Sequence, residues 1–200
     1  SRENTKKALE EAKKQVAEML PFVDSISAKQ AREIIQRYVA AIEGNFTSWM
    51  GATAVSARTL QGRFAAGENL YAEMKERHQE LLHLFALAAN ALPVAQSFEA
   101  VHLEVVSMRE MVGEMNGLKN ITAMAVLEST SEIFIPLLAS LAKKCNGKDF
   151  YYTDKHGTAD EDHAKQFVWA LSYEIEYGGI PIMKIAVRRT LEFLKAIFVP

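Results

Sequence analysis

The stretch that decides the fold covers residues 27–42 and reads Ser27-Ala-Lys-Gln-Ala-Arg-Glu-Ile-Ile-Gln-Arg-Tyr-Val-Ala-Ala-Ile42. Ser27 followed three residues later by Gln30 is the pattern of a capping box, which marks the first turn of a helix. The apolar residues behind it recur at helical spacing, at Ile34, Ile35, Tyr38, Val39 and Ile42. The stretch therefore predicts an amphipathic helix.

Glycine and proline divide the rest of the chain into further long segments with helical periodicity. We expect helices over residues 3–20, 27–64, 68–92, 97–115, 119–144, 153–177 and 180–198, and no convincing strand. The second segment continues the opening stretch, with a kink expected at Gly44 or Gly51. About seven helices without a repeat or a long linker predict an all-α, single-domain helical bundle over residues 1–200, in which residues 1–20 form a peripheral helix.

Composition excludes several classes of protein. Hydrophobic residues make up 49% of the 200 residues and charged residues 24%, the balance of a globular chain with a core. Five prolines and ten glycines are too few turn-formers for a sandwich or barrel of short strands. The formal net charge of -2 offers no basic surplus, so neither nucleic acid nor a membrane is an expected partner. The single cysteine, Cys145, excludes an intrachain disulfide and a thiolate metal cluster.

Membrane insertion and secretion are not expected from the sequence. No window approaches 18 uninterrupted apolar residues, the length that a spanning helix requires. Residues 1–14 are charged and lack the apolar stretch of a signal peptide. We therefore expect a cytoplasmic protein.

The segment His156-Gly-Thr-Ala-Asp160-Glu-Asp-His163 carries the most chemistry in the chain. At about 100° per residue, its two histidines and Asp160 leave one face of a helix within about 60°. Two imidazoles and a carboxylate on one face suit a divalent metal such as iron or manganese. An exposed polar stripe is the alternative, but the nearby Tyr152 and Phe167 favour a buried face.

A second candidate ligand is Glu132, which lies four residues before Pro136 in an otherwise apolar stretch. A proline inside a helix frees the carbonyl four residues earlier and bends the helix. This pattern places a carboxylate where burial is expected, although a boundary glutamate on a kinked helix shows the same pattern. Glu128, one turn earlier, competes for the same role.

A third group of acidic and histidine residues lies between residues 73 and 83. On an unbroken helix Glu76, Glu80 and His83 share one face, so geometry alone favours them as ligands. Glu73 and His78 lie about 140° apart on the same helix and are disfavoured. A solvated helix face is the alternative reading of this group.

These three stretches, in this order, resemble the metal-binding motifs of the heme-oxygenase-like diiron oxidases and oxygenases, which include the CADD-like proteins. The last motif of that superfamily is an aromatic pair followed by H-x3-D-x2-H-A, and the middle one is E-x3-P. The first is N-x3-E and, after a short gap, H-x2-L-x3-F. The matching residues are Tyr151, Tyr152, His156, Asp160, His163 and Ala164, then Glu132 and Pro136, then Asn69, Glu73, His78, Leu81 and Phe85.

The resemblance implies a seven-helix, heme-oxygenase-like fold, shared with the TenA-type thiaminases and the pyrroloquinoline-quinone synthase. It also implies two iron ions per chain, with manganese as the alternative. The implied ligands are Glu73, His78, Glu132, His156, Asp160 and His163. This set includes Glu73 and His78 in place of the residues that helix geometry favours. Glu73 and His78 can meet only if the helix is interrupted between residues 73 and 78. Glu76, His83 and Glu128 remain the alternates.

The activity that the resemblance implies is that of a non-heme, O2-activating oxidase or oxygenase acting on a small organic substrate of the amino-acid or fatty-acid type. One alternative is a metal-free interaction or regulatory protein with the same fold, in which residues 3–20 bind a partner or a second copy in a homodimer. The other is a cofactorless oxidase of the quinone-synthase type. Metal content and O2-dependent colour with Fe(II) distinguish the three.

Overall fold

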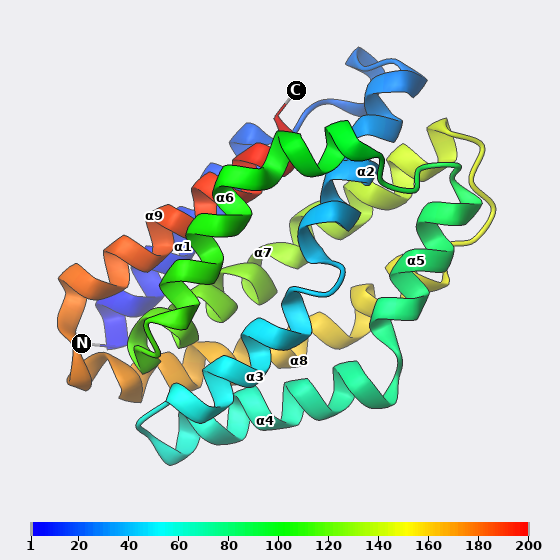
Figure 1. Cartoon of the computed structure of the whole chain (residues 1–200). Coiled ribbons are helices and arrows are strands. Elements are labelled where there is room, and N and C mark those ends of the chain that lie inside the picture. The colour runs from blue at the N-terminus through cyan, green and yellow to red at the C-terminus, as the bar shows by residue number, and fades with distance from the viewer. Residues whose placement is uncertain (1, 200) are drawn as a thin grey trace.

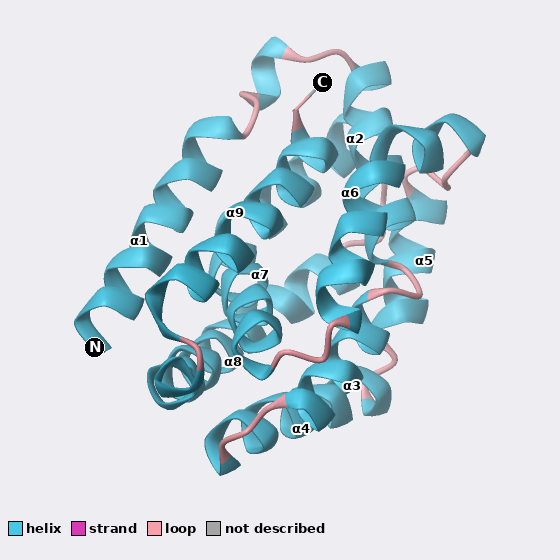
Figure 2. Cartoon of the chain, turned by 60° about the vertical axis from the view of Figure 1, so that its left-hand side comes forward, coloured by secondary structure: helices cyan, strands magenta, loops and turns pink. Residues whose placement is uncertain are grey.

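The computed structural model describes the backbone of residues 2–199 and the side chains of residues 3–156 and 162–199. Over this backbone the chain is helical and contains no strand, as Figure 2 shows, so the prediction of an all-α protein is confirmed. The elements are α1 (Arg2–Met19), η1 (Val23–Ser25), α2 (Ala28–Ile42), α3 (Phe46–Ser56), α4 (Leu60–Lys75), α5 (His78–Ala88), α6 (Ala95–Gly113), α7 (Gly117–Lys144), α8 (Tyr151–Glu174), η2 (Ile175–Tyr177) and α9 (Gly179–Phe198).

The opening stretch forms α2 and begins with the predicted capping box. The Ser27 hydroxyl accepts a hydrogen bond from the backbone N–H of Gln30, whose side-chain oxygen accepts one from the N–H of Ser27. The predicted continuation to residue 64 is wrong, because α2 ends at Ile42 and Gly44 turns the chain with φ 76. The chain then forms α3, and Thr59 caps the start of α4.

The helix predicted over residues 68–92 is also interrupted. Helix α4 ends at Lys75, Arg77 adopts the left-handed conformation with φ 57 and ψ 42, and α5 begins at His78. A left-handed residue ends a helix, and at a residue other than glycine it costs about 1–2 kcal/mol. These interruptions explain why residues 2–199 contain nine α-helices where about seven are predicted.

Helix α7 lies at the centre of the bundle and packs against α1, α2, α3, α8 and α9 (Figure 1). Nearly all of its residues between Gly117 and Ser131 are buried. Among the described residues it is the one helix long and apolar enough to cross a membrane. Since 83% of its apolar window is buried inside the molecule, its composition matches its place in the core.

Helix α1 covers one side of the bundle, at the left of Figure 2. It packs against α7 and α9 and buries Leu9, Ala12 and Val16. Its exposed face is rich in lysine and glutamate, as the sequence of residues 3–20 indicates.

Helices α4 and α8 run antiparallel to each other and are held together by buried polar contacts. At the start of α4, Glu174 accepts hydrogen bonds from the N–H groups of Arg58 and Thr59, at 2.7 and 3.0 Å, and from the Thr59 hydroxyl at 2.7 Å. Farther along, Asn69 Nδ2 donates to Gln166 Oε1 at 3.1 Å. The C-terminal end of α4 therefore faces the first turns of α8, where the last histidine motif lies.

Candidate metal centre

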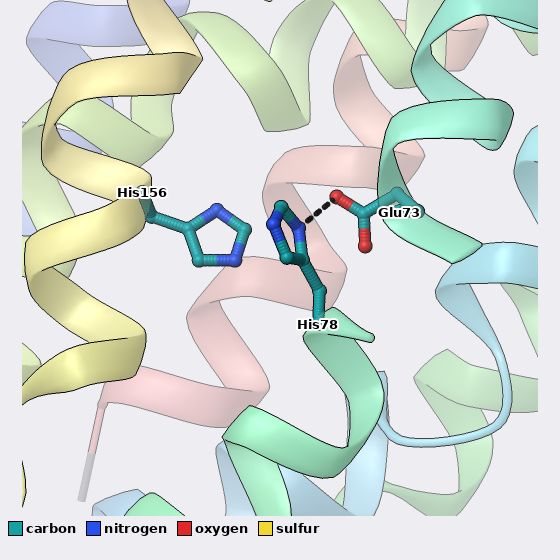
Figure 3. Close-up of side chains that lie close together, drawn as sticks. All are labelled: Glu73, His78 and His156. Atoms are coloured by element: carbon teal, nitrogen blue, oxygen red, sulfur yellow. Dashed lines mark hydrogen bonds and ion pairs between the residues drawn. The ribbon is translucent and has the colours of Figure 1, made fainter. Parts of the chain in front are cut away.

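The helix interruption at Arg77 brings Glu73 and His78 together. Glu73 Oε1 lies 2.7 Å from His78 Nδ1, and the two side chains are 8% and 3% exposed (Figure 3). The same interruption separates Glu76 from Glu80 and His83, so the three no longer share the face of one unbroken helix. The structure therefore brings together the pair that the resemblance implies and not the set that geometry favours.

His156 from α8 joins this pair to make a group of three. Its ring centroid lies 4.5 Å from that of His78, and one ligand atom from each of Glu73, His78 and His156 lies within 4.8 Å of the other two. Figure 3 shows the three side chains converging from α4, α5 and α8. One carboxylate and two imidazoles suit iron or manganese, so the donor set fits the metals that the resemblance implies.

A second acidic and histidine pair lies beside this group. Glu128 of α7 is 5% exposed, and its Oε2 lies 3.9 Å from Nδ1 of His163 on α8. Glu128 lines the same cavity as Glu73, His78 and His156. The side chain of Asp160, the remaining predicted ligand of α8, lies outside the described residues.

Glu132, the predicted middle ligand, does not reach this cavity. Its side chain is 49% exposed, and its Oε1 lies 2.6 Å from Nζ of Lys13 on α1. Glu128 and Glu132 differ by only about 40° around the helix, so their helix face does not separate them. They differ because α7 is enclosed at Glu128 and reaches the surface at Glu132 and Pro136. The alternate, Glu128, therefore replaces Glu132 in the candidate set.

The other alternates lie at the edge of the site. Glu76 Oε2 lies 3.0 Å from Nζ of Lys155 and 3.3 Å from Nε2 of His78, and these hydrogen bonds lower the pKa of Glu76. His83 is half exposed, and its Nδ1 lies 3.2 Å from Oε1 of Glu43. Glu76 therefore contacts a candidate ligand, whereas His83 lies on the surface.

The acidic surroundings of His78 attract positive charge. Burial acts to lower the pKa of His78, but the hydrogen bond and negative charge of Glu73, supported by Glu76, outweigh burial and raise it. The raised pKa means that His78 binds a proton more readily than a free histidine does, and a metal cation bound at this nitrogen would have to displace that proton.

A cavity of about 50 Å³ adjoins the candidate ligands. Its other walls are mainly apolar and come from α2, α3, α5 and α7, with Ile42, Phe46, Leu82, Leu127 and Phe134 among the lining residues. The volume is well below the roughly 150 Å³ of a protein cavity that accepts benzene. In this conformation the cavity has room for a small group beside the ligands.

Two buried tyrosines meet in the same cavity. In the sequence, Tyr152 stands out only as part of the aromatic motif pair and Tyr38 only as a core position, and neither pattern predicts a chemical role. The hydroxyl oxygens of Tyr38 and Tyr152 are 2.8 Å apart, and the Tyr152 ring lies 4.5 Å from that of His156. The available signal was that Tyr38 is the one residue with a polar side chain among the five apolar positions of the predicted helix face. Periodicity alone treats it as a core residue.

Comparison with known proteins found no match among protein-family models, curated proteins or solved structures. The resemblance to heme-oxygenase-like diiron proteins is therefore an expectation from the motif residues alone.

Proposed function

We propose that this protein is a metal-dependent oxidoreductase that uses two iron ions, or manganese in their place, to activate O2 and oxidise a small organic substrate. The observation that carries the proposal is the buried group of Glu73, His78 and His156. The Glu128–His163 pair adds two further donors next to it. Bound iron supplies redox chemistry that these side chains lack on their own.

Five described side chains divide between two metal positions in this proposal. Glu73, His78 and His156 hold the first ion, and Glu128 and His163 hold the second, to which the sequence motif adds Asp160. Two carboxylates inside an apolar core are costly unless cations compensate their charge. Divalent metal ions supply that compensation.

Glu76 orients the ring of His78. Its carboxylate lies near Nε2, so it favours the tautomer that carries the ring proton on Nε2. Nδ1, which faces Glu73, is then free to bind the metal. Lys155 holds Glu76 in place from α8.

The Tyr38–Tyr152 pair serves the substrate side of the cavity. Its hydroxyl groups are polar atoms among largely apolar walls, and the ring of Tyr152 lies beside that of His156. They can hydrogen-bond a polar atom of the substrate or hold a proton at a tyrosine oxygen. The apolar walls exclude water from the same space.

Anaerobic Fe(II) titration of the purified chain tests the proposal. We expect close to two equivalents bound, about one in His156→Ala, and unchanged binding in the control His83→Ala, which removes an exposed histidine. Absence of Fe(II) and Mn(II) binding, or equal binding by His156→Ala and the intact chain, contradicts the proposal.

O2 consumption by the iron-loaded protein then identifies the substrate class. We expect amino-acid or fatty-acid candidates of one class to accelerate O2 uptake and to change the absorption spectrum. Substrate oxidation that proceeds equally after iron is removed with a chelator would support the cofactorless oxidase instead.

A further inference from the structure

Helix α4 carries an apolar stripe on the face that points away from the bundle. Leu60, Phe64, Tyr71 and Met74 are 79%, 56%, 62% and 66% exposed, and Gly67 lies between them. Their spacing alternates between four and three residues over nearly the whole length of the helix. This is the heptad spacing of a coiled-coil seam.

The opposite face of α4 already has its partners in the bundle. Gly62, Ala65, Ala66, Asn69 and Glu73 are buried, and α4 packs against α3 and α8. Figures 1 and 2 both show α4 at the outer edge of the molecule, so a second helix has an open approach to the stripe. A continuous row of this kind differs from single exposed apolar residues, which are normal on protein surfaces.

Gly67, at the middle of the stripe, has no packing explanation in the part of its own chain that the structure describes. A Cβ atom added there would meet no atom of the described residues within 4 Å, and the residue lies inside a helix. Glycine weakens a helix interior, so the position carries a cost that intrachain packing does not offset. Close approach of another helix across the stripe would explain the glycine, because a residue without a side chain lets the two helix backbones come near each other.

We propose that α4 pairs in parallel with α4 of a second copy of this chain, along the seam formed by Leu60, Phe64, Gly67, Tyr71 and Met74. With these residues at the seam positions of the heptad, Arg63 takes position g and Glu68 takes the next position e. In a parallel pair these positions contact each other across the interface. Arg63 and Glu68 carry opposite charges, so a two-fold dimer makes this ion pair twice.

The area of the seam is adequate for a homodimer. Four large side chains that are more than half exposed offer on the order of 500 Å² of apolar surface, the size of the largest patch on a typical monomer. The side-chain stems of Gln61, Arg63, Glu68 and Lys75 add to it. The sum approaches the roughly 800 Å² that each partner contributes to a standard interface. A second copy is self-complementary to this seam because the same residues face one another across the two-fold axis.

Sedimentation velocity of the full chain from 5 to 200 µM (about the range in which such interfaces associate) tests for the dimer. We expect the intact chain to dimerise and Phe64→Glu to raise the dissociation constant at least 100-fold. Leu103→Glu, which changes a 74% exposed residue on α6, is the matched control and retains the dimer. A monomeric intact chain at the highest concentration, or a dimeric Phe64→Glu, overturns the proposal.

The variant Gly67→Leu distinguishes a loss of dimerisation from a loss of helix stability. Leucine favours a helix more than glycine does, so the fold and its helical circular dichroism are preserved. The added side chain nevertheless holds the two helices apart, and we expect at least a tenfold weaker dimer. Unchanged dimerisation of this variant contradicts the close approach at position 67.

Cysteine cross-linking tests the parallel orientation. The native thiol, Cys145, is buried, so a new cysteine acts as the reporter. In a parallel pair, mild oxidation cross-links Leu60→Cys with itself. An antiparallel pair cross-links efficiently only when Leu60→Cys is mixed with Met74→Cys, and this outcome overturns the parallel arrangement.

Arg63→Glu should weaken the dimer tenfold, and the double exchange Arg63→Glu with Glu68→Arg should restore it.

Discussion

Glu128 and Glu132 lie one turn apart on α7 but differ in burial. Glu128 is buried beside His163 and the cavity, whereas Glu132 is half exposed and paired with Lys13. We expect Glu128→Gln to weaken metal binding at least tenfold and to remove about one of two bound ions. Glu132→Gln keeps full binding, because a surface ion pair contributes at most about 1 kcal/mol. Parallel Fe(II) titrations of both variants decide, and loss of metal from Glu132→Gln alone would reverse the assignment.

The raised pKa of His78 predicts opposite pH trends for the metal-free and metal-bound protein. Burial acts to lower this pKa, but the hydrogen bonds and negative charges of Glu73 and Glu76 have the larger combined effect, so the pKa is raised. The contact of protonated His78 with Glu73 and Glu76 therefore stabilises the metal-free fold fully below about pH 6.5, the ordinary pKa of histidine. This stabilisation is lost as the pH rises through the raised pKa of His78. A metal must displace the same proton, so metal affinity rises with pH.

Thermal unfolding with and without Mn(II) measures this difference. The rise in Tm caused by a fixed Mn(II) concentration should be larger at pH 8 than at pH 6. His83→Ala should show the same trend, because His83 lies on the surface. An equal rise at both pH values would mean that His78 does not exchange a proton for the metal.

At the scale of elements, the break between α4 and α5 depends on a single residue in an uncommon conformation. Arg77 has φ 57, which glycine adopts without strain. We expect Arg77→Gly to raise the free energy of unfolding by about 0.5 kcal/mol and to leave metal binding unchanged, since relief of strain exceeds the added chain entropy. Arg77→Val should lower it by about 1–2 kcal/mol, because a β-branched residue tolerates this conformation poorly. Urea unfolding compares the variants, and a valine variant as stable as the original would contradict this account.

The helices were predictable because their signals are local. The capping box of Ser27 and Gln30, the apolar spacing behind it and the Asn116–Gly117 boundary each act within a few residues. The break at Arg77 was not predictable from local signals, since arginine carries none for a left-handed conformation. For the same reason residues 73 and 78 were disfavoured by helical geometry, and only the resemblance paired them.

The choice between Glu128 and Glu132 required information of another kind. Both lie in one apolar stretch and on nearly the same helix face. They differ because neighbouring helices cover α7 at Glu128 but not at Glu132. That depends on the packing of α1 and α8, which is set by contacts between residues far apart in the chain. The sequence predicted a glutamate as the candidate ligand at this point but did not separate the buried Glu128 from the exposed Glu132.

At the scale of the whole molecule, α1 is an integral part of the bundle. It buries Leu9, Ala12 and Val16 against α7 and α9. Removal of residues 1–20 should lower the free energy of unfolding by about 3 kcal/mol or more, because it exposes the apolar surface that these side chains cover. Lys13→Ala, the control, removes only an ion pair and should cost less than about 1 kcal/mol. Guanidinium unfolding checks both, and an undiminished stability of the shortened chain would contradict the packing role of α1.

The spacing of the candidate ligands along the chain sets the order in which they can meet during folding. Glu73 and His78 are five residues apart, so the short loop between them closes at small entropic cost. His156 reaches them only after the intervening helices have docked, which makes its contact with His78 one of high sequence separation. A nascent chain thus presents a two-donor site early and a three-donor site only in the finished fold. If the proposed metal site is correct, we therefore expect tight metal binding only in the folded protein, and weak, reversible binding to the two-donor site of an unfinished chain.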